Sequence, residues 1–351
     1  MILTVSTAII VLAGLVGGVL GATLGALSAL GLAGVVIVGG ELAELFVLDG
    51  TAVGLLATLG VDGAPIGAGP LSTVGLGPLL GPHVAFAGGV GAAAYAGRKG
   101  MIDAGFRYHP AKQIRQPLVG RPWTMLVGGV FGVVGVLLGA VGSFLPVDPV
   151  AFAVVGSAFL VRLTVGYPLL GRFDGTGVFD MSPFENGVYW GETGYETTEG
   201  IAGRHVVEPW QPEYYEWGPV VVLGVTVGVV GAAVALLSES VLLPFGLALV
   251  SLFGVVAGVR IEGYPVPITY HIAFPAGIGA LAVGGTLPVG ILAGTALGVV
   301  GAVLGELSQR ALYAHGDTHV DPAFTSILLS SLLIAVLVLA GVFDAGAVPY
   351  L

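Results

Sequence analysis

Long uncharged stretches constrain this sequence more than any other feature. Residues 2–40 contain no charged side chain, and similar apolar runs recur along all 351 residues. Charged residues make up only 9% of the chain, against about 25% in an ordinary soluble domain. So few charges could not cover the surface of a soluble protein of this size. The pattern excludes a soluble enzyme, a disordered chain and a nucleic-acid binder, and it predicts an all-α, polytopic integral membrane protein whose partner is the lipid bilayer.

The apolar runs predict about ten transmembrane helices. The expected ranges are 4–29, a helix within 31–60, a segment ending near 97, and then 124–145, 150–170, 219–238, 241–259, 267–285, 287–307 and 323–343. Residues 60–82 are apolar but rich in glycine and proline, which favours a broken or re-entrant segment. We divide the chain into a first five-helix unit (1–170), an acidic, aromatic-rich polar loop (171–218) and a second five-helix unit (219–351).

The two units share motifs in the same order, which indicates an internal repeat. Residues 61–66 (VDGAPI) match 261–266 (IEGYPV), 83–86 (HVAF) match 271–274 (HIAF), 132–135 match 298–301 (both GVVG), and 147–149 match 320–322 (both VDP). Glycine and alanine matches carry little weight in a chain with 61 glycines, so the histidine, carboxylate and Asp-Pro matches carry the argument. Chance alignment of a biased composition is the alternative.

The basic residues predict that the second unit is inverted relative to the first. Ten of the 11 lysines and arginines lie in loops that are separated by two predicted helices each time, and Arg162 is the exception. The positive-inside rule places these loops in the cytoplasm and both termini outside. Asp148 lies in a loop without cations, whereas Asp321 shares its loop with Arg310. Inverted repeats with broken helices are the design of many secondary transporters.

The repeat also selects candidate substrate- or ion-binding residues, because ionisable groups within a membrane are functional candidates. The matched pairs are His83 with His271, Asp62 with Glu262, and Phe86 with Phe274. Each histidine opens the third helix of its unit beside a proline-interrupted segment, where it could take up a proton or contact an anionic group. The alternative is that the histidines and carboxylates only cap helix starts.

A second group of candidates follows the ninth predicted helix. His315, Asp317, His319 and Asp321 alternate along the chain, and such ligands suit zinc, manganese or iron; a polar turn and a helix cap explain them equally well. We expect no metal cofactor. Glu306 is a candidate for coupling, although it also forms an ordinary helical pair with Arg310.

Arg162 is the remaining candidate for coupling or gating. It lies inside the fifth predicted helix, near its end. Snorkelling of the guanidinium to the membrane surface is the alternative explanation.

Together these features favour a permease without enzymatic activity. We expect an ion-coupled secondary transporter of a small solute that works by alternating access, with a proton or a sodium ion as the coupling ion, because the chain has no GxxxxGK[ST] motif for ATP. The alternatives are a non-catalytic scaffold or subunit of a membrane complex, and an intramembrane metal-dependent enzyme.

Overall fold

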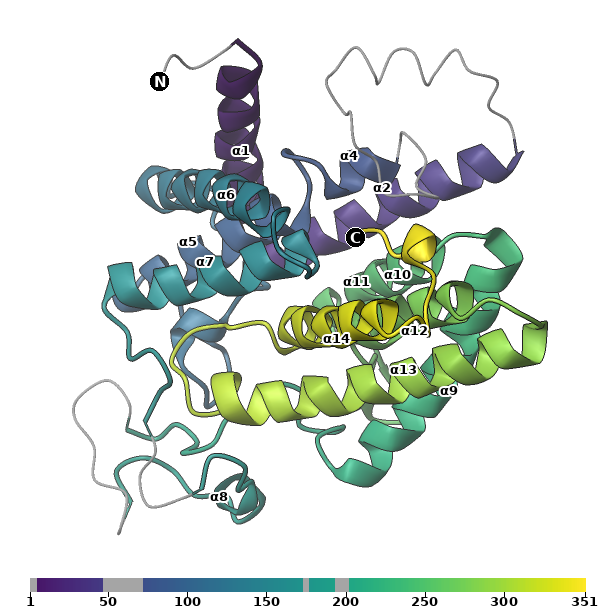
Figure 1. Cartoon of the computed structure of the whole chain (residues 1–351). Helices are drawn as coiled ribbons and strands as arrows, with labels where there is room; N and C mark the ends of the chain where they lie inside the picture. Colours follow the sequence, from purple (N-terminus) through teal and green to yellow (C-terminus); the bar gives the residue numbers. More distant parts are fainter. Residues whose placement is uncertain (1–4, 47–71, 173–176, 193–201) are drawn as a thin grey trace.

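The computed structural model describes residues 5–46, 72–172, 177–192 and 202–351 (Figure 1). The described chain is almost entirely helical. Its longer helices are α1 (Val5–Leu24), α2 (Ala26–Phe46), α5 (Ala87–Arg98), α6 (Pro122–Gly142), α7 (Pro149–Val165), α9 (Trp217–Ser238), α10 (Leu242–Val250), α12 (Tyr270–Ala282), α13 (Leu287–Ser308) and α14 (Pro322–Leu339). Short helices are α4 (Ser72–Leu76), α8 (Ser182–Glu185), α11 (Leu252–Val256), the π-helical turns η1 (Pro82–Phe86) and η3 (Gln309–Tyr313), and the 3₁₀ turns η2 (Pro110–Lys112) and η4 (Ala345–Ala347). A hairpin of β1 (Arg260–Ile261) and β2 (Tyr264–Pro265) completes the described fold.

Six helical segments of the described chain are long and apolar enough to cross a membrane. They are Thr7–Leu24, Ala26–Ala43, Pro122–Gly142, Trp217–Ser238, Leu287–Tyr313 and Pro322–Leu339. Three further apolar stretches are shorter: Pro149–Val165, Leu242–Val256 and Tyr270–Ala282. A helix closes all of its own backbone hydrogen bonds, which is the requirement for a lipid-exposed segment. The all-α prediction is therefore confirmed, and the six long apolar helices are consistent with a membrane location, whereas ten spans remain a prediction.

The predicted first helix, residues 4–29, is wrong because the chain bends at Gly25. This residue has φ +84°, a left-handed conformation that ends α1, and α2 starts at the next residue. A Cβ on Gly25 would lie 2.6 Å from the carbonyl oxygen of Arg115. The glycine thus allows both the turn and the close approach of a distant segment.

Three other boundaries differ from the prediction for local reasons. The predicted helix 150–170 ends at Val165 because Gly166 adopts φ +85°. The predicted helix 241–259 is divided at Ser251 into α10 and α11. Of the predicted broken segment 60–82, the described part contains α4 and the start of η1, and the rest lies outside the described residues, as does the end of the second predicted helix.

Glycines let the helices of each half approach closely. Gly18 of α1 lies against Gly128 and Gly132 of α6, and Gly228 of α9 lies against Gly298 of α13. A Cβ added to Gly18 would lie 2.1 Å from Gly128 O, and one added to Gly298 would lie 2.6 Å from Gly228 Cα, so both would overlap the backbone of the neighbouring helix. These contacts explain the high glycine content, because small residues allow close packing between membrane helices.

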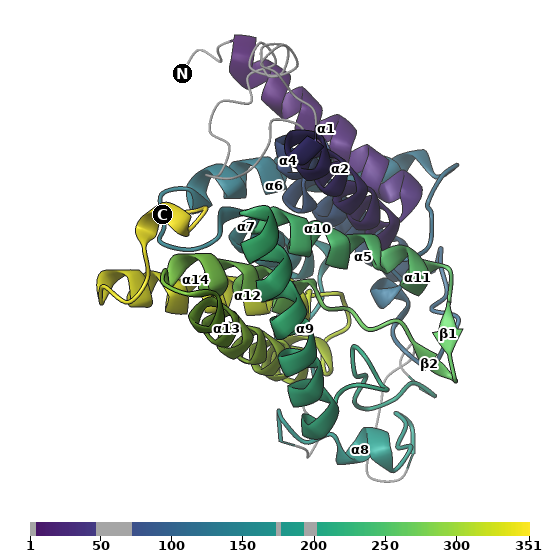
Figure 2. The same ribbon diagram turned by 90° about the vertical axis from the view of Figure 1, so that its right-hand side faces the viewer.

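The polar segments fold together at one end of the molecule. We call residues 98–121, 167–172, 177–192, 202–216 and 314–321 the polar cap. His205 N–H donates to Arg107 O (3.0 Å), Arg172 N–H donates to His315 O (3.1 Å), and Met181, Trp190, Val206, Val207 and Ala314 form a small buried core. Helix α8 and the β1–β2 hairpin lie at the same end (Figure 2). The predicted aromatic-rich loop is therefore a folded structure in its described parts.

Candidate functional site

A cavity of about 480 Å³ lies where the polar cap meets the two predicted halves of the membrane bundle. Leu27 of α2 lines the cavity, together with polar-cap residues between Phe106 and Arg115 and between Phe184 and Glu213. The second half contributes residues between Val255 and Ile268, as well as Tyr313 and His319. Small-molecule sites are typically about 300–1,000 Å³ in volume. The cavity therefore has room for a small solute, and we take it as the candidate site.

Cations outnumber acids on the wall of this cavity. Arg107, Lys112, Arg115 and Arg260 line it, whereas Glu213 is the one acid among the lining residues that the structure describes. The whole chain has 11 basic and 21 acidic residues. More than a third of all cations thus gather at one cavity in a protein of net charge −10. Such a concentration produces a positive local potential.

Lys112 is held in a buried ion pair beside the cavity. Its Nζ lies 2.7 Å from Glu208 Oε2, and the two side chains are 0% and 6% exposed. The ammonium also lies 4.3 Å from the ring centroid of Tyr313, a cation–π arrangement. Burial lowers the pKa of Lys112, while Glu208 opposes that shift. Burial likewise raises the pKa of Glu208, against the effect of Lys112.

A buried hydrogen-bonded chain starts at the cavity wall with His319. Its Nε2 lies 3.1 Å from Asp321 Oδ2, and Asp321 Oδ1 accepts bonds from Tyr270 Oη (2.9 Å) and from Phe324 N–H (2.7 Å). All three polar side chains are at most 4% exposed. The predicted helix cap at Asp321 is confirmed, and the carboxylate also connects a histidine to a tyrosine. This arrangement can hold or pass a proton.

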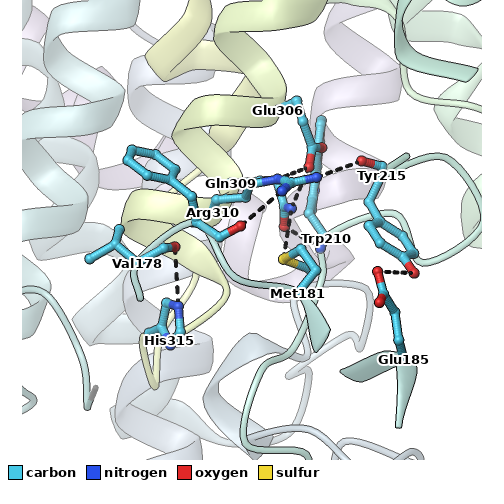
Figure 3. A network of polar contacts seen from close by, with 10 residues as sticks. Val178, Met181, Glu185, Trp210, Tyr215, Glu306, Gln309, Arg310 and His315 are labelled. Atoms are coloured by element: carbon cyan, nitrogen blue, oxygen red, sulfur yellow. Dashed lines mark hydrogen bonds and ion pairs between the residues drawn. The ribbon is translucent and has the colours of Figure 1, made fainter. Parts of the chain in front are cut away.

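The predicted pair of Glu306 and Arg310 is confirmed as part of a larger network (Figure 3). Arg310 Nε lies 2.5 Å from Glu306 Oε1, and the guanidinium also donates to Phe179 O (2.8 Å) and Tyr215 O (3.0 Å). Gln309 Nε2 donates to the same Glu306 oxygen (3.0 Å). The pair therefore anchors the polar cap to the end of α13.

Arg162 is buried rather than snorkelling, since its exposure is 0%. Nε donates to Thr318 Oγ1 (2.9 Å), and Nη2 donates to Leu312 O (2.7 Å) and Thr318 O (3.1 Å). Nη1 donates to Leu169 O. The snorkelling explanation is therefore wrong. The guanidinium joins the end of α7 to the segment that precedes α14.

His83 and His271 occupy matching environments in their two halves. A Cβ on Gly135 would overlap the carbonyl oxygen of His83, and one on Gly301 would overlap that of His271. The His83 ring lies beside Gly139, where a Cβ would be 3.3 Å from Cδ2. In the same way, a Cβ on Gly305 would lie 2.6 Å from Cδ2 of the His271 ring.

The two histidines are not part of the large cavity. Neither is among its lining residues, although His271 lines a separate space of about 30 Å³ with Trp210 and Glu306. The structure thus places the predicted binding histidines at helix contacts, next to glycines of the following helix.

Of the matched carboxylates, the structure describes only Glu262. Glu262 lies in the exposed turn of the β1–β2 hairpin, where it and Gly263 have φ +51° and +87°, as a two-residue turn of this kind requires. Asp62 lies outside the described residues.

The predicted phenylalanines are both core residues. Phe86 is 1% exposed, and its ring centroid lies 5.9 Å from those of His319 and Phe324. Phe274 is 6% exposed and lies 5.0 Å from Phe245.

The four predicted metal ligands divide into two places. His319 and Asp321 form the buried pair above, whereas His315 and Asp317 line a small space of about 10 Å³ near Arg172 and Arg204. His315 Nε2 lies 3.3 Å from Val178 O. In the ranges that the structure describes, no three histidine, aspartate or glutamate side chains converge as metal ligands.

Sequence reasoning missed Lys112, Glu208, Arg115 and Tyr270 as site residues. Lys112 is one of only two lysines in the chain, and that rarity is the signal that could have drawn attention to it. Glu208 lies in an acidic loop, where nothing in the sequence distinguishes it from its neighbours. Only folding of the cap brings it to Lys112.

The chain belongs to the family of unknown function DUF7973, whose family profile matches residues 1–351. No curated protein and no solved structure matches it.

Proposed function

We propose that this member of the family is an ion-coupled secondary transporter, which moves a small solute across a membrane by rocking of two inverted halves around the 480 Å³ cavity. The observation that carries this proposal is the position of the cavity, whose wall includes residues of both halves and of the polar cap. Transporters built from inverted repeats place their substrate sites at the interface of the repeats.

Contacts between corresponding helices support the inversion. The second helices of the two halves are α2 and α10–α11. Here Gly31 packs against Phe253, Gly34 against Leu249, and Ile37 against Gly246. The partner's number falls as the number along α2 rises, so the two helices run antiparallel. A twofold axis in the membrane plane relates helices in this sense, whereas parallel repeats would not.

The fifth helices of the two halves, α7 and α14, give the same result. Asp148 N–H, just before α7, donates to Ser331 Oγ in the middle of α14 (2.9 Å). Arg162, near the end of α7, binds Thr318, which precedes α14. These two helices therefore also run antiparallel. The two halves also share a corresponding helix contact, in which His83 packs against Gly135 and His271 packs against Gly301.

The coupling ion that fits this site best is a proton. His319 is on the cavity wall and is bonded to Asp321, which in turn accepts a bond from Tyr270. A histidine bonded to a buried carboxylate is the kind of group that relays protons in proteins. Glu306 and Arg162 are each bonded within the packed structure, and we assign them to holding the cap and the halves together.

Alternating access can be tested without knowing the solute, because the chain has no cysteine. Val266 lines the cavity. We expect the Val266→Cys variant in vesicles to react with an impermeant maleimide from both sides of the membrane. The exposed hairpin residue Glu262 supplies the control, Glu262→Cys, which should react from one side only.

Coupling is tested on the same background. The ratio of the two labelling rates at Val266→Cys should change with pH, and adding His319→Gln should remove most of that change. Labelling of Val266→Cys from one side alone at every pH would reject transport and favour a scaffold.

A further inference from the structure

The cavity wall combines unneutralised cations with an apolar surface. Of its four cations, Lys112 is paired with Glu208 and Arg260 with Glu213 (2.8 Å). Arg107 and Arg115 have no carboxylate within ion-pair distance among the described residues; instead their guanidinium carbons lie 4.4 Å and 5.6 Å from the ring centroids of Tyr189 and Phe106. Within the described part of the chain, these two positive charges at the cavity therefore have no opposite charge beside them.

Much of the rest of the wall is apolar or aromatic. Leu27, Ile114, Val255, Val266 and Ile268 contribute aliphatic surface, and Trp210 contributes an indole ring. A simple inorganic anion would use the two arginines but leave this surface facing water. An apolar body on the ligand would cover it, and burial of apolar surface contributes about 25 cal/mol per Å².

His319 is a further polar residue on the wall of the cavity. Its Nε2 is used by Asp321, while Nδ1 is buried and has no hydrogen-bond partner in the part of the chain that the structure describes. His319 thus adds a polar side chain to the wall, while its unpartnered Nδ1 is enclosed by protein.

We propose that the cavity binds a small organic anion, namely a carboxylate or phosphate group attached to an apolar body. The anionic group is bound by Arg115 and Arg107, and the apolar body lies against the aliphatic wall. This assignment rests on the proposed function insofar as it names the transported solute, but binding itself does not require transport. An anionic lipid has the same chemistry, so the test must separate the two sources.

The test uses the purified full chain in uncharged detergent micelles, and it follows quenching of tryptophan fluorescence together with calorimetry. Trp210 lies on the cavity wall and is one of four tryptophans. The probes are benzoate, phenyl phosphate and 4-methylpentanoate, with benzamide as the uncharged analogue of benzoate. We expect at least one anion to bind at millimolar or lower concentration, and benzamide to bind much more weakly.

Matched variants locate the binding. Arg115→Gln should weaken binding of the anion by about 10- to 150-fold, since a hydrogen bond to a charged group contributes about 1.5–3 kcal/mol. Lys99→Gln is the control, because Lys99 is an exposed cation of the same basic segment and is not among the residues that line the cavity. Equal affinity in wild type and Arg115→Gln would overturn the assignment, as would binding of none of the three anions.

The lipid arm uses phosphatidylglycerol. If this lipid copurifies with the wild type, is lost in Arg115→Gln and prevents binding of all three probes even after exchange into fresh detergent, the occupant is a lipid and the small-anion proposal is wrong. Binding of benzoate together with one-sided labelling of Val266→Cys would keep the anion site and reject transport. The two proposals can therefore fail separately.

Discussion

Replacement of Lys112 by methionine would leave the Glu208 carboxylate buried without its cation. The wild-type pair has an N–O distance of 2.7 Å with side chains 0% and 6% exposed, and one N–H donor, that of His109 at 3.0 Å, would remain. Breaking a buried ion pair by removing one partner typically costs about 3–5 kcal/mol. We therefore expect the free energy of unfolding of Lys112→Met to fall by about that amount.

A second ion pair on the same wall provides the control. Arg260 and Glu213 are 2.8 Å apart, but their side chains are 53% and 27% exposed. Exposed ion pairs contribute about 0–1 kcal/mol to stability. Arg260→Met should therefore lower the free energy of unfolding much less than Lys112→Met does. Both can be measured by reversible unfolding in mixed micelles of dodecyl maltoside and dodecyl sulfate.

The double variant and pH complete the test. Lys112→Met with Glu208→Gln has no unpaired buried charge, so it should be more stable than Lys112→Met alone. The deficit of the single variant should also shrink as pH falls, because burial raises the pKa of Glu208 and protonation removes the charge. Equal losses for Lys112→Met and Arg260→Met, or a double variant that is less stable than the single one, would refute the reasoning.

Three further variants test other parts of the structure. Gly135→Ala should destabilise the protein by more than about 3 kcal/mol, because the added Cβ would overlap the carbonyl oxygen of His83. Gly39 of α2 has open space around it, so Gly39→Ala should be neutral or slightly stabilising. Equal effects of the two substitutions on stability would contradict the packing. Burial and nearby Arg204 lower the pKa of His109 from 6.5 to about 2. The unfolded chain therefore binds a proton that the folded chain does not, and stability should fall as pH drops below 6.5. His109→Gln should reduce that acid sensitivity in pH-dependent unfolding, and an unchanged profile would count against it.

Much of the fold follows from sequence because hydropathy and length decide where membrane helices form. Most predicted ranges outside the undescribed residues contain a helix within a few residues of the expected bounds. The error at Gly25 has a physical cause. The run also contains Gly14, Gly17, Gly18 and Gly21, and the local sequence does not reveal that Gly25 is the one that takes the left-handed conformation and approaches Arg115.

The residues of the candidate site are harder to predict from sequence than the helices, because they come together only when the polar cap folds. Lys112 and Glu208 lie far apart in the chain, and neither belongs to the repeat that guided the sequence analysis. His319 and Asp321 were selected as metal ligands from their spacing, yet their partner is Tyr270 rather than His315. Spacing predicts which residues can share a face, but it does not predict which distant side chain completes the group.

The inverted arrangement of the two halves is the central claim, and labelling of single cysteines in sealed vesicles of one orientation tests it most directly. Phe144, just before α7, is 87% exposed, and Val342, just after α14, is 51% exposed. Phe144→Cys and Val342→Cys should react with an impermeant maleimide from one side of the membrane, and Glu262→Cys from the other. Reaction of Phe144→Cys and Glu262→Cys from the same side would contradict the account.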